Sequence, residues 1–226
     1  MVLRAFPLVA ATLFCAGLAA AEESPPLPAA PKVPSPCAAD PGARAHDGFF
    51  ARSEPGLAFL WANVSGSGAR QRTGIRGVGQ SAALSVGGTP ARGLVLGGTV
   101  WTARIDPFFI ERGKVVVPDD DSVKVTELRI GPFVDWYPQP KVGFHSLVAV
   151  ELVVEIESDV KGNPVRPEAF GAALALGTGY EWFVASELSL GLIGQLAFGA
   201  TARAASEGTE RTLFIVPELA LAATYH

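Results

Sequence analysis

The sequence predicts an all-β protein, an eight-stranded antiparallel up-and-down transmembrane β-barrel. Hydrophobic residues make up 49% of the chain and charged residues 18%, against about 25% charged in an average soluble domain. Beyond the N-terminal leader, no uncharged stretch reaches the roughly 18–20 residues that a transmembrane helix needs. Instead, polarity alternates residue by residue within short segments. That pattern is typical of strands with one face toward lipid and the other toward a barrel interior.

Residues 1–21 have the features of a secretory signal peptide. Arg4 is the only charge before Glu22, Ala5–Leu18 is apolar, and three alanines end the segment. This order of a positive start, an apolar stretch and small residues predicts cleavage after Ala21 and export from the cytoplasm.

Residues 22–45 contain seven prolines. Repeated prolines favour extended conformations and cannot support a helix or a paired strand. We interpret this stretch as a linker in the periplasm, and residues 46–226 as the outer-membrane barrel.

Eight strands are expected between His46 and His226. They are residues 48–64, 79–88, 93–105, 123–137, 144–158, 169–184, 188–202 and 211–226. The alternation is clearest in the fifth, where Val150 and Leu152 share one parity and Glu151 and Glu155 the other. The facing of the second and third segments stays open.

The connections alternate in length, with short links after segments two, four and six. Longer links follow the other segments, at Ser65–Val78, Asp106–Ser122, Asp159–Glu168 and Arg203–Glu210. Short periplasmic turns and long extracellular loops are typical of outer-membrane barrels, which puts both termini in the periplasm. Pro132 and Pro217 fall inside strands and each removes a hydrogen-bond donor, so each marks either a bulge or a misplaced boundary.

The residues of inward parity carry most of the charges of the strands. We expect an interior network of Arg52, Glu54, Glu127, Arg129, Asp135, Glu151, Glu155, Glu157, Glu181 and Glu218. An eight-stranded barrel is only wide enough to be filled by its own side chains, and buried charges must be paired. One interpretation is a structural network that sets strand register. The other is a narrow cation path, because carboxylates outnumber arginines.

Aromatic residues gather at strand ends, where amphipathic rings prefer a membrane interface. The expected girdle comprises Phe49, Trp61, Trp136, Tyr137, Phe144, Tyr180, Trp182 and Tyr225, with Trp101 also near the outer ends. Core packing in a soluble β-protein would explain the number of aromatics but not this sorting.

With these features, the chain from His46 to His226 resembles small outer-membrane barrels of the OmpA/OmpX/OmpW type. The phrases 46–50 (HDGFF), 131–138 (GPFVDWYP) and 177–182 (GTGYEW) are similar to those of barrel proteins in deltaproteobacteria and myxobacteria. The resemblance implies insertion by the barrel-assembly machinery, which reads a terminal aromatic. Here Tyr225 is penultimate and His226 is last.

The remaining features exclude several functions. The net charge of −4, one unit lower after loss of Arg4 with the leader, argues against nucleic acid as a partner. Cys37, alone after cleavage, can form neither an internal disulfide nor a metal cluster. The three histidines map to periplasmic strand ends, away from an outer-leaflet lipid substrate. We therefore expect no enzyme activity, no cofactor and no metal.

Two loop motifs have alternative interpretations. Arg70, Arg72 and Arg76 crowd the first long loop and could contact lipopolysaccharide phosphates, or the loop is simply solvated. Three aspartates at 119–121 lack the spacing of a calcium loop, which favours a solvated loop.

The sequence thus predicts a monomeric outer-membrane protein with a structural or surface-interaction role through its extracellular loops. Its partners would be membrane lipid and lipopolysaccharide. One alternative is a narrow channel or transporter for small hydrophobic or cationic solutes. Another is a soluble secreted barrel that binds an apolar ligand.

Overall fold

The computed structural model describes residues 48–66, 73–112, 115–118, 123–159, 161–205 and 208–226. Within residues 109–118 it describes the backbone alone. The predicted signal peptide and linker lie outside the described residues. Among the residues described, no helix is long and apolar enough to cross a membrane.

The described chain folds into eight long strands and one short strand. They are β1 (Phe49–Gly66), β2 (Thr73–Ala91), β3 (Leu94–Arg112), β4 (Val115–Pro118), β5 (Val123–Trp136), β6 (Phe144–Asp159), β7 (Ala169–Phe183), β8 (Leu188–Ala205) and β9 (Gly208–Tyr225). Each of the eight predicted segments corresponds to one long strand. The short β4 pairs only with the end of β3 and was not predicted.

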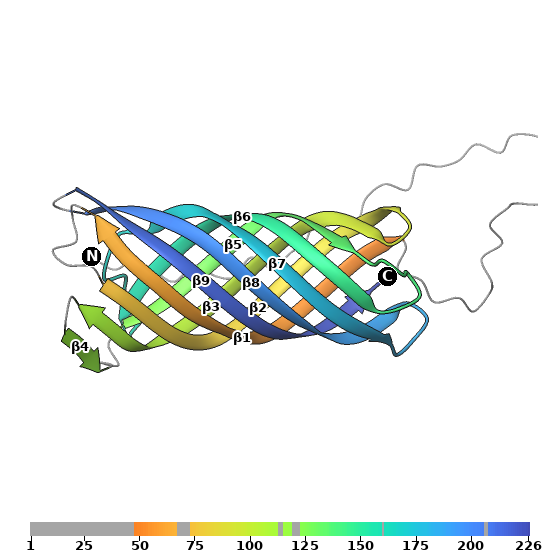
Figure 1. Ribbon diagram of the computed structural model, residues 1–226, viewed down its shortest axis with the longest axis horizontal. Coiled ribbons are helices and arrows are strands. Elements are labelled where there is room, and N and C mark those ends of the chain that lie inside the picture. The colour runs from red at the N-terminus through yellow and green to blue at the C-terminus, as the bar shows by residue number, and fades with distance from the viewer. Residues whose placement is uncertain (1–47, 67–72, 113–114, 119–122, 160, 206–207) are drawn as a thin grey trace, which may run out of the picture. The chain divides into compact units, whose positions relative to one another are not determined.

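The long strands form one closed antiparallel barrel (Figure 1). Each pairs with its neighbours in the chain, and β1 pairs with both β2 and β9, which joins the first strand to the last. Closure satisfies the backbone groups that an open sheet leaves unpaired at its edges. The all-β, eight-stranded antiparallel barrel predicted from the sequence is therefore confirmed.

Side chains alternate strictly between the interior and the outer face. In β1, Arg52, Glu54 and Ala58 are buried, whereas Leu57 and Phe59 are exposed. The structure also settles the facing of the second and third segments. In β2, Ser81, Ala83 and Ser85 point inward, and in β3, Val95, Trp101 and Ala103 do so.

The strands on the β4 side of the barrel are longer than predicted, and three expected loops are correspondingly shorter. The expected loop Asp106–Ser122 is largely strand, because β3 runs to Arg112 and Val115–Pro118 forms β4. The expected loop Ser65–Val78 is largely strand, because β1 runs to Gly66 and β2 begins at Thr73. The expected loop Arg203–Glu210 is wrong for the same reason, because β8 ends at Ala205 and β9 begins at Gly208. Alternation of apolar and polar residues reveals only the part of a strand whose outer face is apolar. The backbone hydrogen bonds between strands continue beyond that part, so strand ends predicted from alternation fall short.

Pro132 and Pro217 lie within regular strands, so neither marks a bulge or a boundary. Pro132 pairs with Gly98 and Pro217 with Leu196, and the register of each ladder is unchanged on both sides. The described wall has two register shifts, both between β2 and β3: one at Arg76/Gly77 toward the β4 end, and one at Gly88/Ala91 beside the turn. A bulge at either place bends that end of the ladder.

The hairpin from β6 to β7 contains an ordered turn around Asp159. The carboxylate of Asp159 accepts the side-chain N–H of Asn163 at 2.9 Å and the backbone N–H of Asn163 at 2.8 Å. These donors stabilise the charged form and lower the pKa of Asp159. This turn lies beyond the apolar part of the wall.

Candidate functional site inside the barrel

All the charged residues predicted for the interior lie there. Their side chains are buried, and they come from five of the eight long strands, β1, β5, β6, β7 and β9. They are Arg52, Glu54, Glu127, Arg129, Asp135, Glu151, Glu155, Glu157, Glu181 and Glu218. Neutral hydrogen-bond partners come from other strands, such as Ser81 on β2 and Trp101 on β3. Charges buried at this density require partners. They form three groups, one near the C-terminal His226, one at mid-height and one near the β4 side.

Arg52 is the centre of the first group. It forms a 2.5 Å ion pair with Asp135 and a short one with Glu54, and lies 3.8 Å from Glu181. Glu54 also accepts a 2.7 Å hydrogen bond from the amide of Gln195. One guanidinium thus connects β1 to β5 and β7 across the interior.

Asp135 is held by a second basic group, the imidazole of His145. The His145 Nδ1 atom lies 2.8 Å from Asp135 Oδ1, and Tyr137 stacks on the ring with centroids 4.9 Å apart. Tyr137 is only 1% exposed, so its assignment to the lipid-facing girdle is wrong. Tyr137 shares the inward parity of Phe133 and Asp135, so alternation places it inside, whereas its position at a strand end had suggested the girdle.

Glu181 gathers the hydroxyl groups near the C-terminus. Ser189 donates to it at 2.6 Å and Thr224 at 2.8 Å, while His226 Nε2 lies 3.5 Å away. Ser189 Oγ is also 3.0 Å from His226 Nε2. Serine, histidine and acid meet here, but Ser189 is fully buried and donates its hydrogen bond to the carboxylate of Glu181. A serine nucleophile would instead donate that hydrogen bond to a base, so this arrangement links strands and does not activate Ser189.

The middle group surrounds Arg129. Its guanidinium lies 3.2 Å from both Glu127 and Glu151 and 3.4 Å from the Trp101 ring centroid. The Trp101 indole N–H in turn donates to Glu218 at 2.7 Å. Trp101 therefore belongs to the interior and not to the outer girdle, a position that the weak alternation of the third segment had concealed.

The third group centres on Arg203, which the sequence analysis placed in a loop. Arg203 pairs with Glu155 and, at 2.6 Å, with Glu157. The half-exposed Arg166 extends the network, 3.5 Å from both Glu157 and Glu210. β8 continues to Ala205, past the predicted end at residue 202, and this extension includes Arg203. Arg203 has the inward parity of Ser189 and Thr201, and that parity was the available signal.

One small cavity lies between two of these groups. A cavity of about 10 Å³, lined by Glu54, Trp101 and Glu151 among others, separates the first group from the middle one. That is close to the smallest volume that accommodates one water molecule. No three His, Cys, Asp or Glu side chains within the described ranges are arranged to hold a metal ion.

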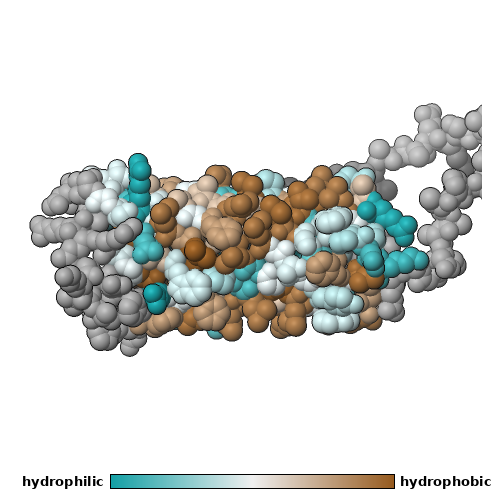
Figure 2. Space-filling view, viewed as in Figure 1, coloured by the Kyte–Doolittle hydropathy of each residue, from teal (hydrophilic) through white to brown (hydrophobic). Residues whose placement is uncertain are grey.

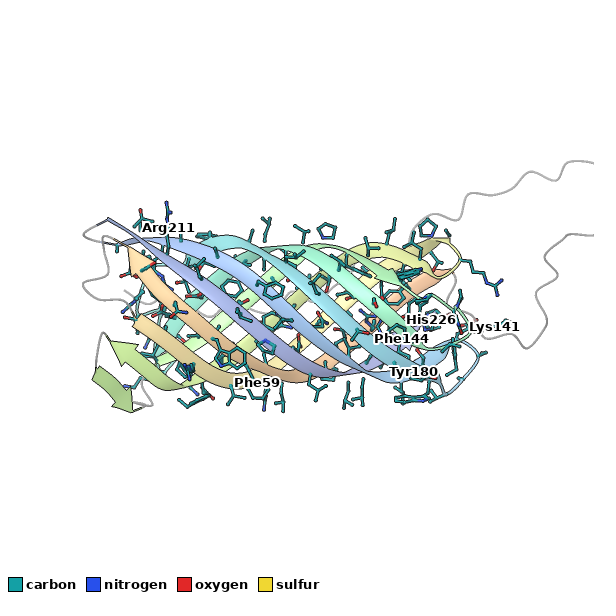
Figure 3. The ribbon with its side chains drawn as sticks, in the orientation of Figure 1. Phe59, Lys141, Phe144, Tyr180, Arg211 and His226 are labelled. Atoms are coloured by element: carbon teal, nitrogen blue, oxygen red, sulfur yellow. The ribbon has the colours of Figure 1, made fainter. Side chains whose placement is uncertain are left out.

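The outer face carries seven of the eight predicted girdle residues. Phe49, Trp136, Phe144, Tyr180, Trp182 and Tyr225 are exposed near the turn ends of their strands, and Trp61 near the opposite end. Figure 3 shows Phe144 and Tyr180 at the same end as the C-terminal His226. Between the two levels, exposed Leu, Val and Ile side chains cover the wall, and Figure 2 shows them as a hydrophobic middle with hydrophilic ends.

The structure describes only one of the three arginines of the predicted basic loop. Arg70, Arg72 and the aspartates 119–121 lie outside the described residues. Arg76 is described, and it lies on β2 with its side chain exposed. Its assignment to a loop is therefore wrong, because β2 begins three residues before it.

No protein-family model and no curated protein matches the chain. Among solved structures, it is similar to the outer membrane protein OprG from Pseudomonas aeruginosa, at 10% identity over 81% of this chain and 99% of that chain, with a TM-score of 0.45. It is similar to Neisserial surface protein A at 12% identity over 79% and 96%, with a TM-score of 0.42. Ail, the attachment invasion locus protein of Yersinia pestis, gives 12% over 79% and 98%, with a TM-score of 0.35.

The Arg52 cluster yields a stability prediction. Replacing Arg52 with Met leaves Glu54 and Asp135 buried without their shared cation, which should lower the free energy of unfolding by about 3–5 kcal/mol. The matched control is Lys124→Met, because Lys124 is part-exposed and pairs with the exposed Asp106 at 2.7 Å. That surface pair should contribute about 0–1 kcal/mol. Urea unfolding in detergent micelles measures both, and equal losses would contradict a structural role for the cluster.

Proposed function

We propose that this chain is an outer-membrane β-barrel protein with a filled interior and no catalytic activity. Its role is structural or one of surface interaction, exercised through the loops at the β4 end. The observation that carries the proposal is the inverted arrangement of the barrel, with charged side chains inside and large apolar side chains outside. Soluble monomers rarely expose contiguous apolar patches larger than a few hundred Å².

The height of the apolar wall supports a bilayer as its surroundings. On β1, the exposed aromatics Phe49 and Trp61 are twelve residues apart. At about 3.3 Å per residue and a strand tilt of about 40°, this spacing corresponds to roughly 30 Å along the barrel axis. The hydrocarbon core of a bilayer has about that thickness.

The predicted leader and the short turns support the orientation. Export through a signal peptide would deliver the chain to the periplasm. At the end opposite β4, the connections have two residues between β2 and β3, seven between β5 and β6 and four between β7 and β8. At the β4 end they have six between β1 and β2, ten between β3 and β5 and nine between β6 and β7, although β8 and β9 are joined by only two. Outer-membrane barrels place the shorter set of connections on the periplasmic side. Both chain ends, the linker and His226 would then be periplasmic, and the β4 end would face outward.

Cell fractionation followed by electrophoresis with and without boiling tests this placement. The full chain should be recovered in the outer-membrane fraction, and the unboiled sample should migrate differently from the boiled one. Closed barrels keep their structure in cold detergent because no strand edge is open to begin unfolding. A band in the soluble periplasmic fraction that boiling does not shift would instead support a soluble barrel that binds an apolar ligand.

A second candidate is the narrow cation channel, which the excess of interior carboxylates favours. The small interior cavity and the ion pairs of Arg52, Arg129 and Arg203 favour the filled barrel instead. In planar bilayers we therefore expect no steady single-channel steps from the folded chain. Regular cation-selective steps that a boiled sample fails to give would establish the channel.

A further inference from the structure

Basic side chains on the outer wall are confined to one sector and one end of the barrel. Within the described strands, the outward-facing ones are Arg76 on β2, Arg104 on β3, Lys124 on β5 and Arg211 on β9. These four strands and β1 are consecutive around the barrel. Figure 3 places Arg211 at the end opposite Lys141 and His226. The described outward positions of β6, β7 and β8 carry no basic residue.

A groove in this sector combines an apolar and a charged part. It has a volume of about 320 Å³ and is lined by Leu57, Val78, Gly79, Gln80, Arg104 and Asp106. Leu57 and Val78 are exposed members of the apolar wall. In the ladder, Arg104 pairs with Gln80, which pairs with Leu57, and Asp106 pairs with Val78. The groove therefore places charged and apolar side chains at neighbouring positions of the wall.

The charges of the groove leave a net positive site. Asp106 is already paired with Lys124, at 2.7 Å between Nζ and Oδ1. Arg104 has no ion-pair partner within the described ranges, and its side chain is exposed. A guanidinium at a lipid boundary is stabilised by a phosphate, which it can bind through two parallel hydrogen bonds.

We propose that this groove binds the phosphorylated headgroup of an acylated glycolipid, such as the lipid A of the outer leaflet. Arg104 is the principal phosphate ligand, and acyl chains lie over Leu57 and Val78. A free anion would satisfy Arg104 but would leave the apolar part of the groove uncovered. The proposal rests on the outer-membrane placement above, and it moves lipopolysaccharide contact from the first loop to the wall.

The test uses the full-length mature chain, refolded into nanodiscs of neutral phosphatidylcholine and checked for its boiling-dependent shift. Native mass spectrometry measures the lipid retained when bisphosphorylated lipid A or dephosphorylated lipid A with the same acyl chains is added. Inorganic phosphate is added separately as a competitor. The variant is Arg104→Gln, and the matched control is Lys141→Gln, which removes one exposed positive charge from the opposite end.

We expect the wild-type chain and Lys141→Gln to retain lipid A about tenfold more strongly than its dephosphorylated form, since a hydrogen bond to a charged group contributes about 1.5–3 kcal/mol. Arg104→Gln should remove most of that preference. Inorganic phosphate should compete weakly, because it lacks the acyl chains. Three results would overturn the proposal: equal retention of the two lipids, equal loss in both variants, or full displacement by inorganic phosphate. A chain that fails to insert at all would overturn the outer-membrane placement itself.

Discussion

The pairing of β1 with β9 is the constraint on which the rest of the structure depends. It joins the first long strand to the last, so that no long strand is left with an unpaired edge. Lipid offers no hydrogen-bond partners to the backbone. A sheet that crosses a membrane therefore satisfies all its backbone N–H and C=O groups only when it closes into a barrel. Closure also forces every second side chain inward. The small interior must then hold whatever the sequence places at those positions.

The interior accommodates its charges because each arginine serves several carboxylates. Arg52 connects β1 with β5, Arg129 connects β5 with β6, and Arg203 connects β8 with β6. A shift of one strand by one position would turn every one of its side chains to the other face of the sheet. Such a shift would therefore break each of these ion pairs. The three groups therefore specify the register of the barrel at three heights. Buried ion pairs are better supported as devices of specificity than as sources of stability.

The sequence was sufficient to predict the strands and their facing wherever the outer face is apolar and polarity alternates. The charged interior followed from the same parity, as Glu151 and Glu155 illustrate. Alternation could not predict what lies beyond the apolar wall, which is why Arg203 and β4 were missed. It also failed at Trp101, where glycines and small residues blur the pattern of β3. Tyr137 was placed in the girdle because it lies at a strand end, although its parity is that of the inward Asp135.

Charged residues on the outer face, which interrupt the apolar pattern of the wall, were the hardest to interpret from the sequence. Arg104 and Arg76 are unremarkable in the chain, and only the register of β2 against β3 places them on one sector of the rim. Pro132 was equally hard to interpret. Proline lacks a backbone N–H, and the effect of that loss depends on which residue of the neighbouring strand lies opposite it. Such positions take their meaning from the residues across the strand, which a single sequence does not reveal.

The central claim is that the apolar wall faces lipid and not water. It is tested most directly by comparing Val150→Arg with Ser65→Arg in chains folded into bilayers. Val150 is exposed midway along β6, and Ser65 is exposed near the outer end of β1. An arginine at the bilayer midplane should lower the free energy of unfolding by about 2–4 kcal/mol, and one near the interface by about 0–1 kcal/mol. Equal small effects at the two positions, or a stabilising effect of Val150→Arg, would contradict a lipid-facing wall.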